Sequence, residues 1–314
     1  MSLMANYPNG FASGIQIRGV PLIQTHPGKV FWVGNSATLQ VGEKSASNGN
    51  DGSFFAPFST IDYAVGQCAA NRGDIIFVRP GVTETVTAAA GLALDVAGIA
   101  LIGLGSGSNR PTINFTTATT ADMNVDSANI TMVNFLFTGG FDALVGPIDV
   151  NAADFKLLDC EWRDVTGQAT DVIVTDANAD RILIDGLFFN GAAAAGANSA
   201  IVLVGNDNPV IRNSKIIGNF AVAAIDCRTT AVVDLSIHDV YIWNKNAADV
   251  CVKDTVTGST GRVGPNLQLM LTDNAANITE ACTGATFHYF DPIYVCNLAG
   301  EKAMLTNITA STDA

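Results

Sequence analysis

A short pattern of hydrophobic and polar positions returns five times between Asn129 and Asn244. In each copy, an aliphatic residue is followed two positions later by Asn or Asp, and three positions after that by a large apolar residue. Self-similarity with a period of 20 to 50 residues is typical of stacked repeats, in which each short unit closes its core only against its neighbours. The five copies, whose Asn/Asp positions lie 25, 26, 28 and 26 residues apart, are Met132-Asn134-Phe137, Leu157-Asp159-Trp162, Leu183-Asp185-Phe188, Ile211-Asn213-Ile216 and Ile237-Asp239-Ile242.

The residues around each Asn or Asp are strand and turn formers. Short runs of Ile, Val, Leu, Phe and Trp are broken by Gly, Asn, Asp and Thr, and no ten-residue amphipathic helix fits between two copies. A second apolar run follows later in each period, so one period holds several short strands. We therefore predict an all-β fold, a parallel β-helix in which each period is one coil. The second runs lie at residues 148–150, 172–174, 201–204, 224–225 and 250–252.

The spacing inside the pattern predicts a corner at each Asn or Asp. Side chains alternate between the two faces of a strand, yet the large apolar residue lies three positions after the polar one, so the alternation slips by one residue there. Asn and Asp tolerate left-handed backbone angles better than other non-glycine residues. We expect two buried columns, one of Met132, Leu157, Leu183, Ile211 and Ile237, and the other of Phe137, Trp162, Phe188, Ile216 and Ile242.

The segments before and after the repeats differ from them. Residues 1–47 are punctuated by Gly and Pro, and we interpret them as an N-terminal arm. One amphipathic helix is predicted over residues 59–72, with Ser59 as its N-cap and Gly73 after its end, and it would cap the open end of the solenoid. The β-helix is expected over residues 48–261. Residues 262–314, where the register fades, are expected to form a C-terminal β cap or assembly segment.

The opening of the predicted β-helix carries a specific signature. It consists of DGS at residues 51–53, PFSTID at 57–62, GDIIFV at 73–78 and PG at 80–81, followed by GIALIG at 98–103 and PTINF at 111–115. These stretches resemble the first coils of right-handed parallel β-helix proteins of the pectate-lyase-like superfamily, and the resemblance covers about residues 48–255. It implies the fold but no single activity, because the superfamily includes polysaccharide lyases, hydrolases, epimerases, phage tailspikes and non-catalytic virion proteins.

The overall composition carries a second resemblance. The chain is low in charge and rich in Ala, Gly, Asn and Thr, and together with residues 293–302 this is similar to β-helix proteins of tailed bacteriophages or prophages. The resemblance implies a virion-associated protein. It also implies a homotrimer with helices side by side.

Charge and cysteine content narrow the function classes. Only 14% of the 314 residues are charged, and the net charge is −13. Scarce charges favour a surface partly buried in an assembly, and the acidic balance disfavours nucleic acid and membranes as partners. Six cysteines without a CxxC pair, and only three histidines, make zinc unexpected and predict buried reduced thiols. No signal peptide is visible, which favours a virion protein assembled in the bacterial cytoplasm over a secreted adhesin.

The best local candidate for catalysis is the run Glu161-Trp162-Arg163-Asp164. Glu161 and Arg163 fall on the predicted outer face, but the matching positions of the flanking coils carry no acid, whereas glycosidic hydrolysis needs two carboxyl groups. Under a lyase alternative, the superfamily resemblance implies Ca²⁺ bound by acidic oxygens and an Arg or Lys base. Otherwise we expect no catalytic residues, no cofactor and no metal. Other polar residues are interpreted as structural, namely Asp149, Asp171, Asp176, Asp226, Asp254 and His238.

The predicted outer columns also place large apolar side chains on consecutive coils. Neighbouring coils lie about 4.8 Å apart, so these side chains would merge into a patch of the kind that marks an interface, unless a loop or the C-terminal segment covers it. We hypothesise a homotrimeric, non-enzymatic virion component that decorates a capsid or forms a spike beside other virion proteins. The alternative is a tailspike-like protein that binds or degrades a host surface polysaccharide. The predicted contact residues are Leu187, Phe189, Ile217, Tyr241 and Trp243.

Overall fold

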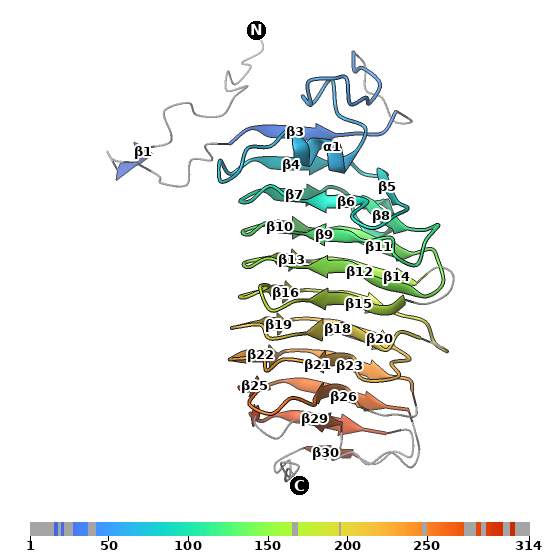
Figure 1. The fold of residues 1–314 in the computed structure, drawn as a ribbon, viewed down its shortest axis with the longest axis vertical. Coiled ribbons are helices and arrows are strands. Elements are labelled where there is room, and N and C mark those ends of the chain that lie inside the picture. Colours follow the sequence, from blue (N-terminus) through green and yellow to red (C-terminus); the bar gives the residue numbers. More distant parts are fainter. Residues whose placement is uncertain are drawn as a thin grey trace.

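The computed structural model is a stack of β-coils with its N-terminal strands at one end and its C-terminal strands at the other (Figure 1). Within the described residues, three long sheets contain ten, ten and eight strands, and a separate antiparallel pair is formed by β1 (Gln16–Ile17) and β2 (Val20–Pro21). The predicted parallel β-helix is therefore confirmed. The structure describes residues 16–17, 20–21, 28–36, 42–164, 169–194, 196–246, 250–272, 281–283, 287–297 and 302–304.

Each of the coils from β4 to β27 contributes one strand to each sheet, and neighbouring strands of the three sheets are parallel except for the last pair of the second sheet. Sheet 1 contains β3 (Val30–Val33), β4 (Ile75–Val78), β7 (Ala100–Gly103), β10 (Thr131–Val133), β13 (Lys156–Leu158), β16 (Leu183–Asp185), β19 (Val210–Arg212), β22 (Leu235–His238), β25 (Gly261–Val263) and β28 (Phe287–Tyr289). Sheet 2 contains β5 (Thr83–Val86), β8 (Thr112–Phe115), β11 (Leu136–Gly139), β14 (Glu161–Asp164), β17 (Phe188–Asn190), β20 (Lys215–Gly218), β23 (Tyr241–Asn244), β26 (Leu267–Leu271), β29 (Ile293–Cys296) and β30 (Lys302–Met304). Sheet 3 contains β6 (Leu92–Leu94), β9 (Met123–Val125), β12 (Leu144–Val150), β15 (Ala169–Thr175), β18 (Ser199–Leu203), β21 (Ile225–Cys227), β24 (Val252–Asp254) and β27 (Cys282–Thr283).

Both buried columns exist, but the coil of β16 and β17 is shifted by one residue from the prediction. Ile184, not Leu183, pairs with Leu157 and Ile211 in sheet 1, and Phe189, not Phe188, pairs with Trp162 and Ile216 in sheet 2. Leu183 is half-buried and Phe188 is 36% exposed, so these two expected core positions are wrong. The other eight expected core side chains are buried: Met132, Leu157, Ile211, Ile237, Phe137, Trp162, Ile216 and Ile242.

The shift has its origin at the corner between sheets 1 and 2. Asn134, Asp159, Asn213 and Asp239 have positive φ angles of 63°, 52°, 49° and 56°, as predicted, but in the shifted coil it is Gly186 that turns, with φ 73°. Glycine adopts this conformation more readily than the preceding Asp. The corner residues also hold the coils together, because the backbone N–H groups of Asn134, Asp159, Gly186 and Asp239 donate to carbonyl oxygens of the next coil.

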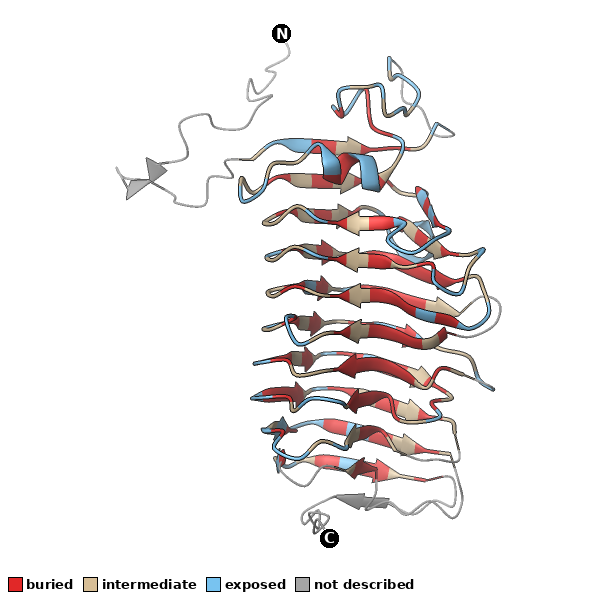
Figure 2. Cartoon of the chain, viewed as in Figure 1, coloured by how far each residue is buried: buried red, intermediate tan, exposed pale blue. Residues whose placement is uncertain are grey.

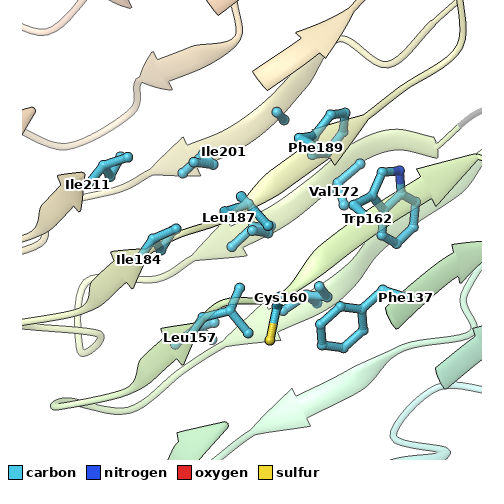
Figure 3. Packing of buried hydrophobic residues seen from close by; sticks show 14 of the residues in the cluster. Phe137, Leu157, Cys160, Trp162, Val172, Ile184, Leu187, Phe189, Ile201 and Ile211 are labelled. Atoms are coloured by element: carbon cyan, nitrogen blue, oxygen red, sulfur yellow. The ribbon is translucent and has the colours of Figure 1, made fainter. Parts of the chain in front are cut away.

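The core is a continuous column of apolar side chains along the stack. Figure 3 shows Phe137, Trp162 and Phe189 on successive coils of sheet 2, beside Leu157, Ile184 and Ile211 from sheet 1. The ring of Trp162 stacks on Phe189 at 6.1 Å between centroids, with an interplanar angle of 17°. Burial therefore recurs from coil to coil, as the red bands of Figure 2 show. None of the six cysteines, all of which are described, forms a disulfide, and Cys160, Cys227, Cys251 and Cys282 are buried.

The helix is shorter than predicted. Helix α1 spans only Ile61–Gly66, and its N-cap is Thr60, whose side chain accepts from the backbone N–H of Tyr63. The expected cap Ser59 instead donates its hydroxyl to Asn48 Oδ1 at 3.0 Å. Buried Ile61, Ala64 and Val65 join the core, but a capping function for the helix stays a prediction. Among the described residues, no helix is long and apolar enough to cross a bilayer.

The described parts of the two chain ends differ from the expected boundaries. β3 belongs to sheet 1 and pairs with β4, so part of the expected arm continues the stack. At the other end, β26, β28 and β29 extend sheets 1 and 2 beyond residue 261. Most of the remaining arm and of residues 298–314 lies outside the described residues.

One carboxyl group in the first coils predicts a pH effect on stability. Glu84 is 7% exposed, accepts from the backbone N–H of Ile61 at 2.7 Å, and burial raises its pKa from 4.5 to about 6. The pKa of Glu84 is higher in the folded than in the unfolded protein, so folding with a charged Glu84 costs free energy. This cost is absent below pH 4.5, where Glu84 is protonated, and the wild type loses the corresponding stability as the pH rises to 6. The shift corresponds to about 2 kcal/mol.

The variant Glu84→Gln isolates this effect, since its amide oxygen can still accept from Ile61. Urea unfolding should show that the stability of the variant relative to wild type increases by about 2 kcal/mol between pH 4 and pH 7. A difference that stays constant with pH would show that Glu84 is not protonated at low pH in the folded protein.

Candidate functional site

Glu161 lies on the outer face of β14, as predicted, but it is enclosed by two arginines. One carboxylate oxygen, Oε2, bonds to the Nη2 of Arg110, which comes from the preceding coils. The other, Oε1, accepts from Arg163 Nε at 3.0 Å and Nη2 at 2.5 Å. The Glu161 side chain is 9% exposed. Both oxygens are therefore occupied, and the arrangement is that of a structural ion-pair network.

Asp164, the third candidate in this run, serves the core and not the outer cluster. Its Oδ1 accepts from the indole N–H of Trp162 at 2.9 Å, and its Oδ2 accepts from the backbone N–H of Ala192 at 2.7 Å. Burial raises the pKa of Asp164, against the lowering effect of these two donors. The structure thus places Glu161 and Arg163 in one ion-pair network, whereas Asp164 bonds to an indole and a backbone group outside it.

A second polar cluster, which the sequence did not reveal as a site, lies on the outer face of sheet 3. Arg228, just after β21, donates Nη2 to Asp171 Oδ2 at 2.6 Å, and its Nη1 lies 3.5 Å from Asp226 Oδ2. Asp171 belongs to β15, two coils away from β21. Both acids were expected to be structural, and they lie within strands β15 and β21.

In the Asp171–Arg228–Asp226 cluster, the two carboxyl groups are buried and the guanidinium group of Arg228 is partly exposed. The side chains of Asp171 and Asp226 are 10% and 3% exposed, and that of Arg228 is 33% exposed. Burial raises the pKa of both carboxyl groups, while Arg228 lowers it. Asp171 Oδ1, Asp226 Oδ1 and the hydroxyl of Ser199, the strand partner of Asp171, have no hydrogen-bond partner among the described residues. Paired carboxyl groups with raised pKa values beside an arginine are the components of acid–base chemistry.

An acidic row continues along sheet 3 but does not assemble a metal site. Asn151 Nδ2 donates to Asp126 Oδ1 at 3.1 Å and to Asp149 Oδ2 at 3.0 Å, which links neighbouring coils. Burial raises the pKa of Asp149, and Asp126 and Asp176 add to this effect. In the part of the chain that the structure describes, no group of three His, Cys, Asp or Glu side chains is placed to hold a metal ion. The Ca²⁺ of the lyase alternative stays untested.

The predicted contact residues divide between the core and the surface. Leu187 and Phe189 are 2% and 0% exposed and point into the core, so their placement on the outer face is wrong (Figure 3). The one-residue shift at Gly186 is the reason, because it exchanges the inner and outer faces of β17. Ile217, Tyr241 and Trp243 do lie on the outer face of sheet 2, half-buried.

The outer face of sheet 1 is apolar from β3 to β13, which the repeat pattern did not predict. Its two outward columns are aligned by strand pairing from β3 to β13, and among these ten described positions Lys156 alone is charged. The ring of Trp32 stacks on Phe77 at 5.0 Å and meets the edge of Phe54 at 4.9 Å. The columns are Val30, Ile75, Ala100, Thr131 and Lys156, and Trp32, Phe77, Ile102, Val133 and Leu158.

The same sheet becomes polar further along the stack. Asp185 accepts from Arg212 Nε at 2.8 Å, and His238 Nδ1 lies 2.6 Å from Asp239 Oδ2, in agreement with a structural role for this histidine. Beyond them, an open pocket of about 640 Å³ is lined by residues that include Arg262 and His288. Sheet 1 therefore has an apolar half and a polar half.

Comparisons with known proteins extend only to the fold. No protein-family model matches the chain, and no curated protein does either. Similar solved structures include a rhamnogalacturonan lyase, 13% identical over 82% of this chain and 75% of its own, with a TM-score of 0.45. Another is an alginate lyase from Paenibacillus sp. str. FPU-7, 11% identical over 85% of this chain and 97% of its own, with a TM-score of 0.30. Similarities this distant say nothing about what this chain binds or cleaves.

Proposed function

We propose that this protein is a non-enzymatic structural component whose copies associate side by side through sheet 1. The observation that carries the proposal is the apolar outer face between β3 and β13. With coils about 4.8 Å apart, the five strands span about 20 Å along the stack. Trp32 and Phe77 lie at its N-terminal end, Ile102 lies at its middle, and Val30 is 45% exposed. Contiguous apolar surface of this kind favours an interface over a solvated face.

The distribution of charge along sheet 1 favours copies that lie parallel. The apolar half begins at β3, whereas Asp185, Arg212 and Arg262 follow from β16 onward. If two copies run in the same direction, apolar coils meet apolar coils, and the charged groups other than Lys156 stay at the other end. An antiparallel pair would bury the charges against apolar side chains, which costs free energy. Rotation about an axis parallel to the stack therefore fits this face, and a homotrimer is the simplest form consistent with the sequence resemblance.

The particle in which such a component would serve is that of a tailed bacteriophage or prophage. Support comes from the low charged fraction of 14% and from the resemblance of the composition and of residues 293–302 to β-helix proteins of tailed bacteriophages. The protein would then be made in the bacterial cytoplasm and become part of the virion, as capsid decoration or as a spike, in contact with other virion proteins. Mass spectrometry and immunogold labelling of purified particles test this role. Recovery of the protein only from the particle-free fraction would contradict it.

A consequence of this proposal is the absence of turnover on acidic polysaccharides. Because Arg110 and Arg163 occupy both oxygens of Glu161, neither oxygen is free to contact a substrate. Full-length protein incubated with pectate or alginate, with and without Ca²⁺, should release neither unsaturated nor reducing ends. Steady release that disappears in Glu161→Gln would overturn the prediction at this cluster.

The Asp171–Arg228–Asp226 cluster supports a second candidate function, a carbohydrate-active enzyme. Two carboxyl groups with raised pKa values, joined by one guanidinium, have the composition that lyases and hydrolases use. In the same assay, turnover that is unaffected by Glu161→Gln but lost in both Asp171→Asn and Asp226→Asn would favour this function. Their buried oxygens must first become accessible to a substrate, which is why the structural function is preferred.

A further inference from the structure

The open pocket of about 640 Å³ lies over the last four strands of sheet 1, outside the proposed self-association face and toward the C-terminal end of the stack (Figure 1). Its lining residues come from β19, β22, β25 and β28 and from positions next to these strands. Val210 and the buried Leu235 give the pocket an apolar side, and its polar residues include Asp234, Arg262 and His288. Pockets of this size are typical of sites for small molecules.

Arg262 brings a positive charge to the pocket. Strand pairing places Ser236, Arg262 and His288 at one outward position of three successive coils. Ser236 Oγ accepts from Arg262 Nε at 2.9 Å, which orients the guanidinium group. The two Nη groups of Arg262 donate to none of the described residues, and Arg262 forms no ion pair with any of them. Two parallel N–H groups are the geometry that binds a carboxylate through both of its oxygens.

Asp234 brings a negative charge to the same pocket. It belongs to a column of corner residues before sheet 1, Asp154, Arg181, Asn208 and Asp234, whose φ angles are 63°, 54°, 55° and 54°. In the earlier coils, Arg181 donates to both carboxylate oxygens of Asp154 at 2.8 Å, so these two charges neutralise each other. The backbone N–H of Asp234 donates to Thr260 Oγ1 at 3.0 Å. The carboxylate of Asp234 has no hydrogen-bond or ion-pair partner within the described parts of the chain.

The unpaired charges of Arg262 and Asp234 together point to a ligand that carries both signs of charge. A simple anion would be attracted by Arg262 but repelled by Asp234, and a simple cation would meet the reverse. A zwitterion satisfies both groups. The ring of Phe290, which also lines the pocket, is 49% exposed and adds apolar surface to that of Leu235. An α-amino acid has a carboxylate, an ammonium group and a side chain on one carbon, so it matches these three kinds of contact.

A phosphate ester fits this pocket less well than an amino acid. It carries close to two negative charges at neutral pH, whereas the pocket holds a single arginine together with Asp234. The charges of the pocket are thus balanced by a ligand that brings one anionic group and one cationic group.

We infer that the pocket between β19 and β28 binds a free α-amino acid with an apolar side chain. Its carboxylate bonds to Arg262, its ammonium group pairs with Asp234, and its side chain packs against Phe290 and Leu235. Because the three contacts differ in kind, the pocket distinguishes the two enantiomers. The site needs no catalytic group and no residue between β3 and β13, so ligand binding and self-association can fail separately.

Saturation-transfer NMR on the full chain tests the inference with four probes. These are L-phenylalanine, D-phenylalanine, 3-phenylpropionate, which lacks the ammonium group, and 2-phenylethylamine, which lacks the carboxylate. One enantiomer of phenylalanine should bind at one site per chain, at least about five-fold more tightly than the other, the scale of one lost polar contact. The two analogues with a single charge should each bind about ten-fold more weakly than that enantiomer, because each leaves one charged group of the pocket unpaired.

Three variants assign the two charges to their residues. Arg262→Gln should weaken phenylalanine binding about ten-fold without weakening that of 2-phenylethylamine. Asp234→Asn should weaken it up to about five-fold, as expected for an exposed charge pair, without weakening that of 3-phenylpropionate. The control Arg181→Gln removes an arginine whose side chain is 53% exposed from the paired corner and should leave the Kd unaltered.

Four results would each overturn the inference. The first is the absence of phenylalanine binding at millimolar concentrations, and the second is equal affinity for the two enantiomers. The third is an affinity for 3-phenylpropionate that equals or exceeds that for phenylalanine, which would reveal a simple anion site. The fourth is a loss in Arg181→Gln as large as that in Arg262→Gln.

Discussion

Replacing Trp162 with alanine is expected to lower the free energy of unfolding by about 3–5 kcal/mol. The indole is fully buried between the rings of Phe115 and Phe189, with centroids at 6.1 Å on each side. Its N–H also donates to Asp164 Oδ1, a half-buried acceptor that the variant leaves without this partner. Coils so thin cannot collapse onto the space of a removed indole, so the cavity persists. Urea unfolding followed by circular dichroism measures the loss.

The pair Phe188 and Phe189 provides a matched control for this core column. Phe189→Ala should cost about as much as other buried Phe→Ala changes, 3–5 kcal/mol, whereas Phe188→Ala, one position away on the outer face, should cost well under half of that. The two variants remove the same atoms from adjacent positions. Equal losses, or a larger loss in Phe188→Ala, would show that the register of β17 is wrong.

The repeat and its corners could be read from the sequence because they depend on local chemistry. The Asn or Asp at each corner and the apolar residues around it recur at nearly constant spacing, so the fold class and eight of ten core side chains followed. The error at β16 and β17 has a local cause. Asp185 and Gly186 can both turn a corner, and Leu183-Ile184 and Phe188-Phe189 offer an apolar residue in either register. Only alignment with the neighbouring coils decides between them.

The polar clusters could not be predicted in the same way. Arg110 reaches Glu161 across 51 residues of sequence, and Arg228 reaches Asp171 across 57. These contacts join coils that are not adjacent in the sequence pattern, through long side chains whose direction no periodicity fixes. The apolar face of sheet 1 was missed for another reason. Its residues at β3, β4 and β7 precede the five recognisable repeats, so the predicted columns did not include them.

Introducing a charge on sheet 1 is expected to dissociate the protein. Ile102 lies in the middle of the apolar half, half-buried within one chain and paired with Phe77 and Val133. In Ile102→Asp, each contact would bury an unpaired carboxylate, which costs about 2–5 kcal/mol of association free energy. The control Thr85→Asp adds the same charge at an exposed position of sheet 2 and should leave the oligomer intact. Circular dichroism should be unchanged in both variants.

Three results of this comparison would contradict the proposed interface. The first is an unchanged mass in Ile102→Asp with the fold preserved. The second is dissociation by Thr85→Asp, which would move the contact to sheet 2. The third is dissociation in Tyr294→Ala, which would indicate that the outer face of sheet 2 is the contact between copies.

The most direct test of a self-associating structural protein is the mass of the wild type in solution, measured by light scattering at several concentrations. The single chain has a mass of 32.6 kDa. The account predicts a stable multiple of this mass, three chains for the proposed trimer, that persists on dilution and is insensitive to salt because the contact is apolar. A soluble species that remains at 32.6 kDa across the concentration range would contradict it.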